Sequence, residues 1–184
     1  MRDMSFSTAL LLAPLAYTLH HFEEHILFNF REWRLLYFPD SNALSTEIIF
    51  MILTAITLLY VLLHNLFESR ATAMSVLLFL MATQVQNSLF HLGATLYFWD
   101  FSPGLYTALL LYLPVNFLIA LKAFRESWVT AKSLLVLFFV GGTSFWFFEV
   151  FGPIVIGITV LSTLIWILVD RERLHDCVGY YESC

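Results

Sequence analysis

Residues 133–169 read SLLVLFFVGGTSFWFFEVFGPIVIGITVLSTLIWILV, an apolar stretch of 37 residues with one charged side chain, Glu149. One helix over this stretch would be about 55 Å long at about 1.5 Å per residue, whereas the hydrocarbon core of a membrane is about 30 Å thick. Two helices fit better. Their break is expected at Gly152 and Pro153, because proline lacks an N–H and suits the first turn of a new helix.

Four more apolar runs precede this stretch, and each is close to the roughly 20 residues that a membrane helix needs. The chain is 60% hydrophobic and 12% charged, whereas soluble domains are about half apolar and a quarter charged. We therefore expect an all-α, polytopic transmembrane helical bundle with six spans, five being the alternative, in a single domain over residues 1–184. The expected spans are about 6–28, 46–65, 71–98, 104–122, 131–148 and 153–169.

The distribution of Lys and Arg favours six spans. With six, seven of the nine basic residues lie on one side, and only Arg31 and Arg34 lie on the other. Five spans would divide them five to four. The positive-inside rule then predicts that both termini are cytoplasmic. The seven are Arg2, Arg70, Lys122, Arg125, Lys132, Arg171 and Arg173.

The net charge of -5 and the absence of a basic stripe in the sequence argue against a nucleic-acid partner. We expect membrane lipids as partners and a bacterial inner (cytoplasmic) membrane as the location. The sequence leaves the oligomeric state open.

Residues 29–42, NFREWRLLYFPDSN, connect the first two spans and interleave aromatic with charged side chains. They fit a short amphipathic segment in the headgroup region. An ordinary loop that carries part of an aromatic belt is the alternative.

The first span contains the unusual sequence HHFEEH at residues 20–25. Ionisable groups inside a membrane cost a few kcal/mol each and rarely face lipid. Because helix positions i, i+3 and i+4 share a face, His20 converges with Glu23 and Glu24, and His21 converges with Glu24 and His25. Imidazole and carboxylate groups are ligands for zinc, iron and manganese. Two structural alternatives are His–Glu hydrogen bonds that pin helices together, and a wet loop beyond the helix end.

His91 in the third span is expected at the same depth. Spans one and three both run outward, which places residues 20–25 about 21–29 Å along their helix and His91 about 30 Å along its own. Asn87 lies one turn before His91 and is expected to orient its imidazole or position a water. Gln84 is expected to hydrogen-bond between helices.

Other ionisable residues fall at defined levels. Glu47, Asp100 and Glu149 lie at the same outer level as the cluster. His64 lies at the opposite end, where we expect it at the membrane interface.

Two motifs overlap in the cluster. His21-x-x-Glu24-His25 matches the H-x-x-E-H pattern of inverted zinc peptidases. His20-x-x-Glu23-Glu24 resembles the signature of the HXXEE family of small bacterial integral membrane proteins. The resemblance continues through Asn87-Ser-Leu-Phe-His91, Ser102-Pro103-Gly104-Leu-Tyr-Thr107 and Pro114, and it covers about residues 12–120.

The resemblance implies that His20, Glu23, Glu24 and His91 form the functional set. It implies no mechanism, because the activity of the family is not established. Independently of it, Pro103 and Gly104 predict a turn, and Ser102 or Thr107 is expected to cap the fourth helix.

These residues predict a metal-dependent membrane enzyme. His20, His91 and one of Glu23 or Glu24 would bind a divalent metal, zinc first and iron or manganese as alternatives. The remaining glutamate would act as general base on metal-bound water, Asn87 would assist, and His21 and His25 are further candidate ligands.

The outer-leaflet position favours a lipid or amphipathic substrate, with hydrolysis of an ester or amide as the first choice. Redox chemistry at a di-metal site is less favoured and would need more carboxylates, Glu47 or Glu149. The main alternative is a non-enzymatic binder or carrier that binds a cation or relays protons, although no internal repeat of the kind common in carriers is visible. A third is a subunit whose polar cluster docks a partner.

Overall fold

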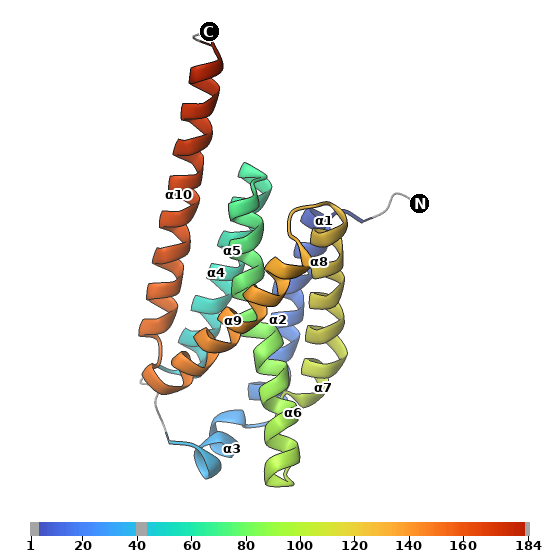
Figure 1. The fold of residues 1–184 in the computed structure, drawn as a ribbon. Coiled ribbons are helices and arrows are strands. Elements are labelled where there is room, and N and C mark those ends of the chain that lie inside the picture. The colour runs from blue at the N-terminus through green and yellow to red at the C-terminus, as the bar shows by residue number, and fades with distance from the viewer. Residues whose placement is uncertain (1–3, 40–43, 183–184) are drawn as a thin grey trace.

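The computed structural model describes residues 4–39 and 44–182, with side chains up to Arg171, and all regular structure in these residues is helical (Figure 1). The expected all-α membrane bundle is therefore confirmed. Five helices are long and apolar enough to cross a membrane. They are α4 (Thr46–Phe67), Arg70–Phe98, Leu105–Arg125, α9 (Ala131–Phe151), and the membrane-length part of α10 (Ile154–Glu182), which ends at Arg171.

The first expected span is a composite helix. It consists of α1 (Phe6–Leu10), α2 (Leu12–Phe22) and the π-helical turn η1 (Glu23–Leu27), with only Leu11 between the first two. From Phe6 to Leu27 it is about 33 Å long at about 1.5 Å per residue, enough for one crossing. With the five long helices it makes six membrane-length helical runs in the described part of the chain.

The long apolar stretch forms two helices, as expected. α9 ends at Phe151 and α10 begins at Ile154. Between them Gly152 adopts φ 69° and ψ −152°, a conformation that favours glycine. α10 continues well beyond the expected end of the last span.

One end of the bundle is basic. The start of α1, the α4–α5 turn, the α8–α9 loop and the end of α10 lie there together (Figure 1). Arg70, Lys122, Arg125, Lys132 and Arg171 belong to these segments. Arg2 and the side chain of Arg173 lie outside the described residues.

Residues Phe30–Tyr37 form the short helix α3 at the opposite end, and the Asn29 side chain caps it. Trp33 is buried, and its Nε1 and the Tyr37 hydroxyl both donate to Asp100 Oδ2 at 2.8 Å. The hydrogen bond to Asp100 raises the pKa of Tyr37. Arg34 forms a 2.7 Å ion pair with Glu149 of α9. These contacts anchor α3 across that end of the bundle.

Three membrane helices contain a π-helical turn: η1, η2 (Met81–Val85) and η3 (Ala108–Tyr112). η2 joins α5 (Arg70–Leu80) to α6 (Gln86–Phe98), and η3 joins α7 (Leu105–Thr107) to α8 (Leu113–Arg125). Such turns disturb the regular helical hydrogen bonds and often occur at functional sites. Here side chains bond nearby carbonyls: Ser88 Oγ donates to Ala108 O at 3.2 Å, and Asn116 Nδ2 donates to Tyr112 O at 2.8 Å.

Gln84 links helices, as expected. Its Nε2 donates to Ala13 O at 3.0 Å, and its Oε1 accepts from Asn116 Nδ2 at 2.8 Å. It therefore satisfies polar groups inside the bundle.

His64 lies in the last turn of α4 and is enclosed by other helices. It is fully buried, its Nδ1 lies 3.0 Å from Thr72 Oγ1, and its ring packs against Phe6 and Trp128. The side chain packs against protein because α1 and the segment after α8 cover this face of α4. Its position at the depth of the membrane interface stays a prediction.

Candidate metal centre

The composite first helix and α6 bring His20, Glu24 and His91 together. His20 Nε2 lies 3.2 Å from Glu24 Oε1, and His91 Nε2 lies 2.9 Å from the same oxygen. All three side chains are buried, and one ligand atom from each lies within 4.8 Å of the others. We call these three residues the primary triad.

The contacts in the primary triad are short but lack hydrogen-bond geometry. His20 Nε2, His91 Nε2 and Glu24 Oε1 therefore have no hydrogen-bond partner in the described structure. A buried polar atom without a partner is costly. Two imidazoles and one carboxylate with converging lone pairs fit a divalent ion, since His₂Glu sets bind zinc and two-His-one-carboxylate sets bind iron.

Two hydroxyl groups contact the Nδ1 atoms of the His20 and His91 imidazoles, on the side of each ring away from Nε2. Thr107 Oγ1 lies 2.9 Å from His20 Nδ1, and Ser102 Oγ lies 2.9 Å from His91 Nδ1. Such contacts set ring orientation and leave the Nε2 atoms facing Glu24. The expectation that Ser102 or Thr107 caps the fourth helix was wrong, because both hydroxyls point back to the histidines. Asn87 forms no hydrogen bond with His91, whose Nδ1 contacts Ser102 instead.

Glu23 caps the fourth helix in their place. Its carboxylate accepts from the backbone N–H groups of Tyr106 at 3.1 Å and Thr107 at 2.7 Å, and from the Thr107 hydroxyl. A carboxylate at a helix N-terminus satisfies free donors and interacts favourably with the helix dipole. Glu23 is buried, and it belongs to neither group of possible metal ligands found among the described residues.

Gly104 packs directly against the primary triad. Its φ of 100° is strained for other residues. A Cβ at this position would lie 2.8 Å from Glu24 Cγ and 2.9 Å from Cε1 of both His20 and His91. Glycine therefore lets the α6–α7 connection close over the site.

His21, Glu24 and His25 form a second group of possible ligands. His25 Nε2 lies 3.4 Å from Glu24 Oε2, and the His21 and His25 rings are 4.4 Å apart. Both histidines are half-buried, so this group is more open than the primary triad.

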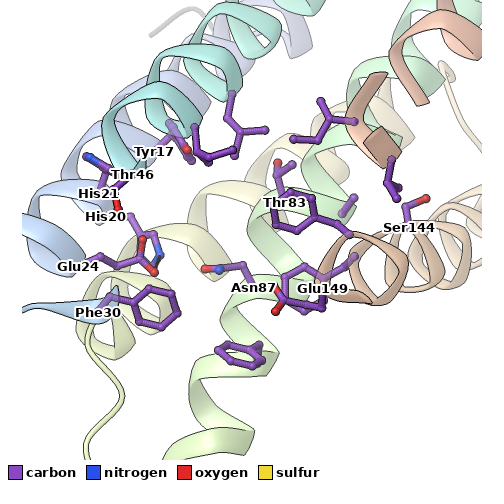
Figure 2. A pocket seen from close by; sticks show the side chains of 18 of the residues that line it. Tyr17, His20, His21, Glu24, Phe30, Thr46, Thr83, Asn87, Ser144 and Glu149 are labelled. Atoms are coloured by element: carbon purple, nitrogen blue, oxygen red, sulfur yellow. Dashed lines mark ion pairs between the residues drawn. The ribbon is translucent and has the colours of Figure 1, made fainter. Parts of the chain in front are cut away.

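A cavity of about 200 Å³ extends from this cluster between α4, η2, α9 and α10 (Figure 2). Its wall is largely apolar but also includes the polar side chains of His20, Glu24 and Glu149. Asn87 reaches into the cavity, and its Oδ1 is buried without a hydrogen-bond partner. Further lining side chains are His21, His25, Arg31, Arg34, Leu53, Phe79, Phe145, Phe148, Val155 and Ile156.

The other acids at this level have separate positions. Glu149 lines the cavity and pairs with Arg34, Asp100 holds α3, and Glu47 is exposed at the start of α4.

The family described as "Protein of unknown function with HXXEE motif" matches residues 11–119, more than half of the chain. The chain belongs to this family. No curated protein and no solved structure matches the chain. The structure divides the HXXEE motif by role: His20 and Glu24 join His91, whereas Glu23 caps a helix.

Sequence reasoning missed the functions of Ser102, Gly104 and Thr107 at this site. The only signal was the presence of hydroxyl residues and a glycine in the block SPGLYT that follows His91. From the sequence alone, this block predicts a turn and a helix cap.

Proposed function

We propose that the protein is a metal-dependent integral membrane enzyme, a hydrolase that cleaves an ester or amide bond in a lipid or other amphipathic substrate. The main support is the primary triad, which lies beside a cavity. Its atoms His20 Nε2, His91 Nε2 and Glu24 Oε1 converge and are buried without hydrogen-bond partners. Zinc is the first choice of ion, and iron and manganese share the same ligand types.

The cavity supports an amphipathic substrate. Apolar side chains from four membrane helices line most of it, and His20, His21 and Glu24 lie together on one side of it (Figure 2). A substrate with an acyl chain and a polar ester or amide group fits this cavity. The acyl chain would contact the apolar wall, and the polar group would lie beside Glu24.

A bound divalent ion would supply Lewis-acid chemistry by polarising the carbonyl and lowering the pKa of a water ligand. In hydrolysis the water oxygen bonds to the acyl carbon, the acyl carbon–oxygen or carbon–nitrogen bond breaks, and the water proton ends on the leaving group. Asn87, with its free Oδ1 in the cavity, is placed to hold the water. The Glu23 carboxylate already accepts hydrogen bonds from the start of the fourth helix. These bonds favour a positioning role for Glu23 over the role of general base.

We further propose that the basic end of the bundle is cytoplasmic in a bacterial inner membrane, which puts the site near the outer leaflet. The support is the charge asymmetry and the positive-inside rule.

The test is the metal content of detergent-purified protein, measured by elemental mass spectrometry for wild type, His91→Ala and His64→Ala. His64 is a matched control, since it is equally buried and also contacts a threonine hydroxyl through Nδ1. We expect at least one ion per chain in wild type and His64→Ala, and a loss in His91→Ala. A folded, chelator-free preparation without metal would contradict the proposal and favour a proton-relay function.

A further inference from the structure

The two oxygens of Glu24 face different sets of histidines. Oε1 faces His20 and His91 at 3.2 and 2.9 Å, and Oε2 faces His25 at 3.4 Å. One carboxylate thus belongs to both groups of possible ligands, the buried primary triad and the more open group of His21, Glu24 and His25.

We propose that Glu24 bridges two divalent metal ions, the second held by Oε2 of Glu24 and the imidazoles of His21 and His25. This inference rests on the proposed function, which requires only the ion in the primary triad. The ligand class is a zinc, manganese or iron(II) ion, because imidazole and carboxylate suit these borderline ions.

The local helix geometry brings the second group together. His21 lies three residues before Glu24 and four before His25, a spacing that places all three on one helix face. The π-helical turn η1 begins at Glu23, and within it His25 Nε2 approaches Glu24 Oε2. His21 is one turn earlier, and its ring is 4.4 Å from that of His25.

Aromatic neighbours hold both rings of the second group. Phe50 of α4 stacks on His21 with centroids 4.1 Å apart and planes 18° apart. Phe30 of α3 meets His25 edge-on at 6.0 Å. Helices α3 and α4 therefore restrict these imidazoles, which lowers the entropy lost on binding an ion.

The two positions differ in their access to the cavity. Gly104 and two hydroxyls pack against the primary triad, of which His20 and Glu24, but not His91, line the cavity. His21, Glu24 and His25 all line the cavity, so an ion there keeps coordination positions open toward a substrate. Paired ions of this kind can clamp the attacking and leaving oxygens of a hydrolytic reaction.

The experiment is zinc stoichiometry after metal removal and reloading of the detergent-purified full chain. We expect two zinc ions per chain in wild type and in His64→Phe, but one in His21→Phe and in His25→Gln. His21→Phe keeps an aromatic ring against Phe50 while removing the ligand nitrogen. One ion in wild type, unchanged in both variants, would overturn the second site and leave the proposed function standing. No ion in wild type would overturn both.

A second measurement needs no variant. Wild-type protein loaded with Mn²⁺ is expected to show the electron paramagnetic resonance spectrum of an exchange-coupled pair. The spectrum of isolated Mn²⁺ at full loading would overturn the bridge, even if His21 or His25 variants failed to fold.

Discussion

Gly104 approaches Glu24 so closely that a Cβ on the glycine would lie 2.8 Å from Glu24 Cγ. The same Cβ would crowd His20 and His91 at 2.9 Å. This glycine is therefore part of the primary triad's wall, and its missing side chain is what permits the three ligands to meet under the α6–α7 connection.

We expect Gly104→Ala to lower both stability and metal content. The positive φ costs about 1–3 kcal/mol for a non-glycine residue, and overpacking adds about 1–3 kcal/mol. Thermal unfolding in detergent and elemental mass spectrometry measure the two effects. Gly93→Ala is the control, because a Cβ there meets nothing within 4 Å. Its unfolding temperature should stay the same or rise. Equal behaviour of the two variants would refute the close-packing argument.

Glu23 and Glu24 should respond differently to loss of charge. Glu23→Gln weakens charge-assisted hydrogen bonds to the start of the fourth helix, each worth about 1.5–3 kcal/mol. We expect a lower unfolding temperature with the metal retained. Glu24→Gln should release the metal, because it removes the charged ligand shared by the histidines. Exposed Glu68→Gln should change neither property. A Glu23→Gln protein of wild-type stability that lacked only activity would instead identify Glu23 as the base.

Ser102→Ala tests the support behind His91. The variant removes the hydroxyl 2.9 Å from His91 Nδ1 and no ligand atom. Loss of such an orienting contact typically lowers metal affinity by about 10–100-fold. Competition with a chromophoric zinc chelator would measure the change. Thr143→Val is the control, because that exposed hydroxyl bonds only the carbonyl of Phe139 in its own helix. Unchanged zinc affinity in Ser102→Ala would mean that packing alone orients the ring.

The sequence predicted the bundle well because a membrane imposes a simple requirement: long, apolar, internally hydrogen-bonded helices. Pro153 and Gly152 marked the one ambiguous break. The HHFEEH stretch marked the site because ionisable groups are costly in a span. Spans one and three run in the same direction, so the rise per residue predicted that His91 lies at the same depth as this stretch. The two are about 70 residues apart in the sequence.

The division between Glu23 and Glu24 was not predictable in the same way. It depends on the π-helical turn at Glu23–Leu27, and these residues carry no local pattern that separates it from an α-helix. The hydroxyl partners Ser102 and Thr107 belong to another segment, and only its tertiary approach reveals their targets. Turn and capping propensities are local signals, so they misassigned both residues.

Asp100→Asn tests whether α3 is held at the site end of the bundle by Asp100. One oxygen of Asp100 accepts from both Trp33 Nε1 and Tyr37 OH at 2.8 Å. A neutral amide accepts more weakly than a carboxylate, so α3 should undock more often. Hydrogen–deuterium exchange is the measurement, and we expect faster exchange at Phe30–Tyr37 but unchanged exchange in the buried part of α5. The ion in the primary triad should be retained, since none of its three ligands lies on α3. Phe30 and Arg34 of α3 also line the cavity. Unchanged exchange in α3 would contradict the prediction and show that the Arg34–Glu149 ion pair and apolar packing suffice to hold α3.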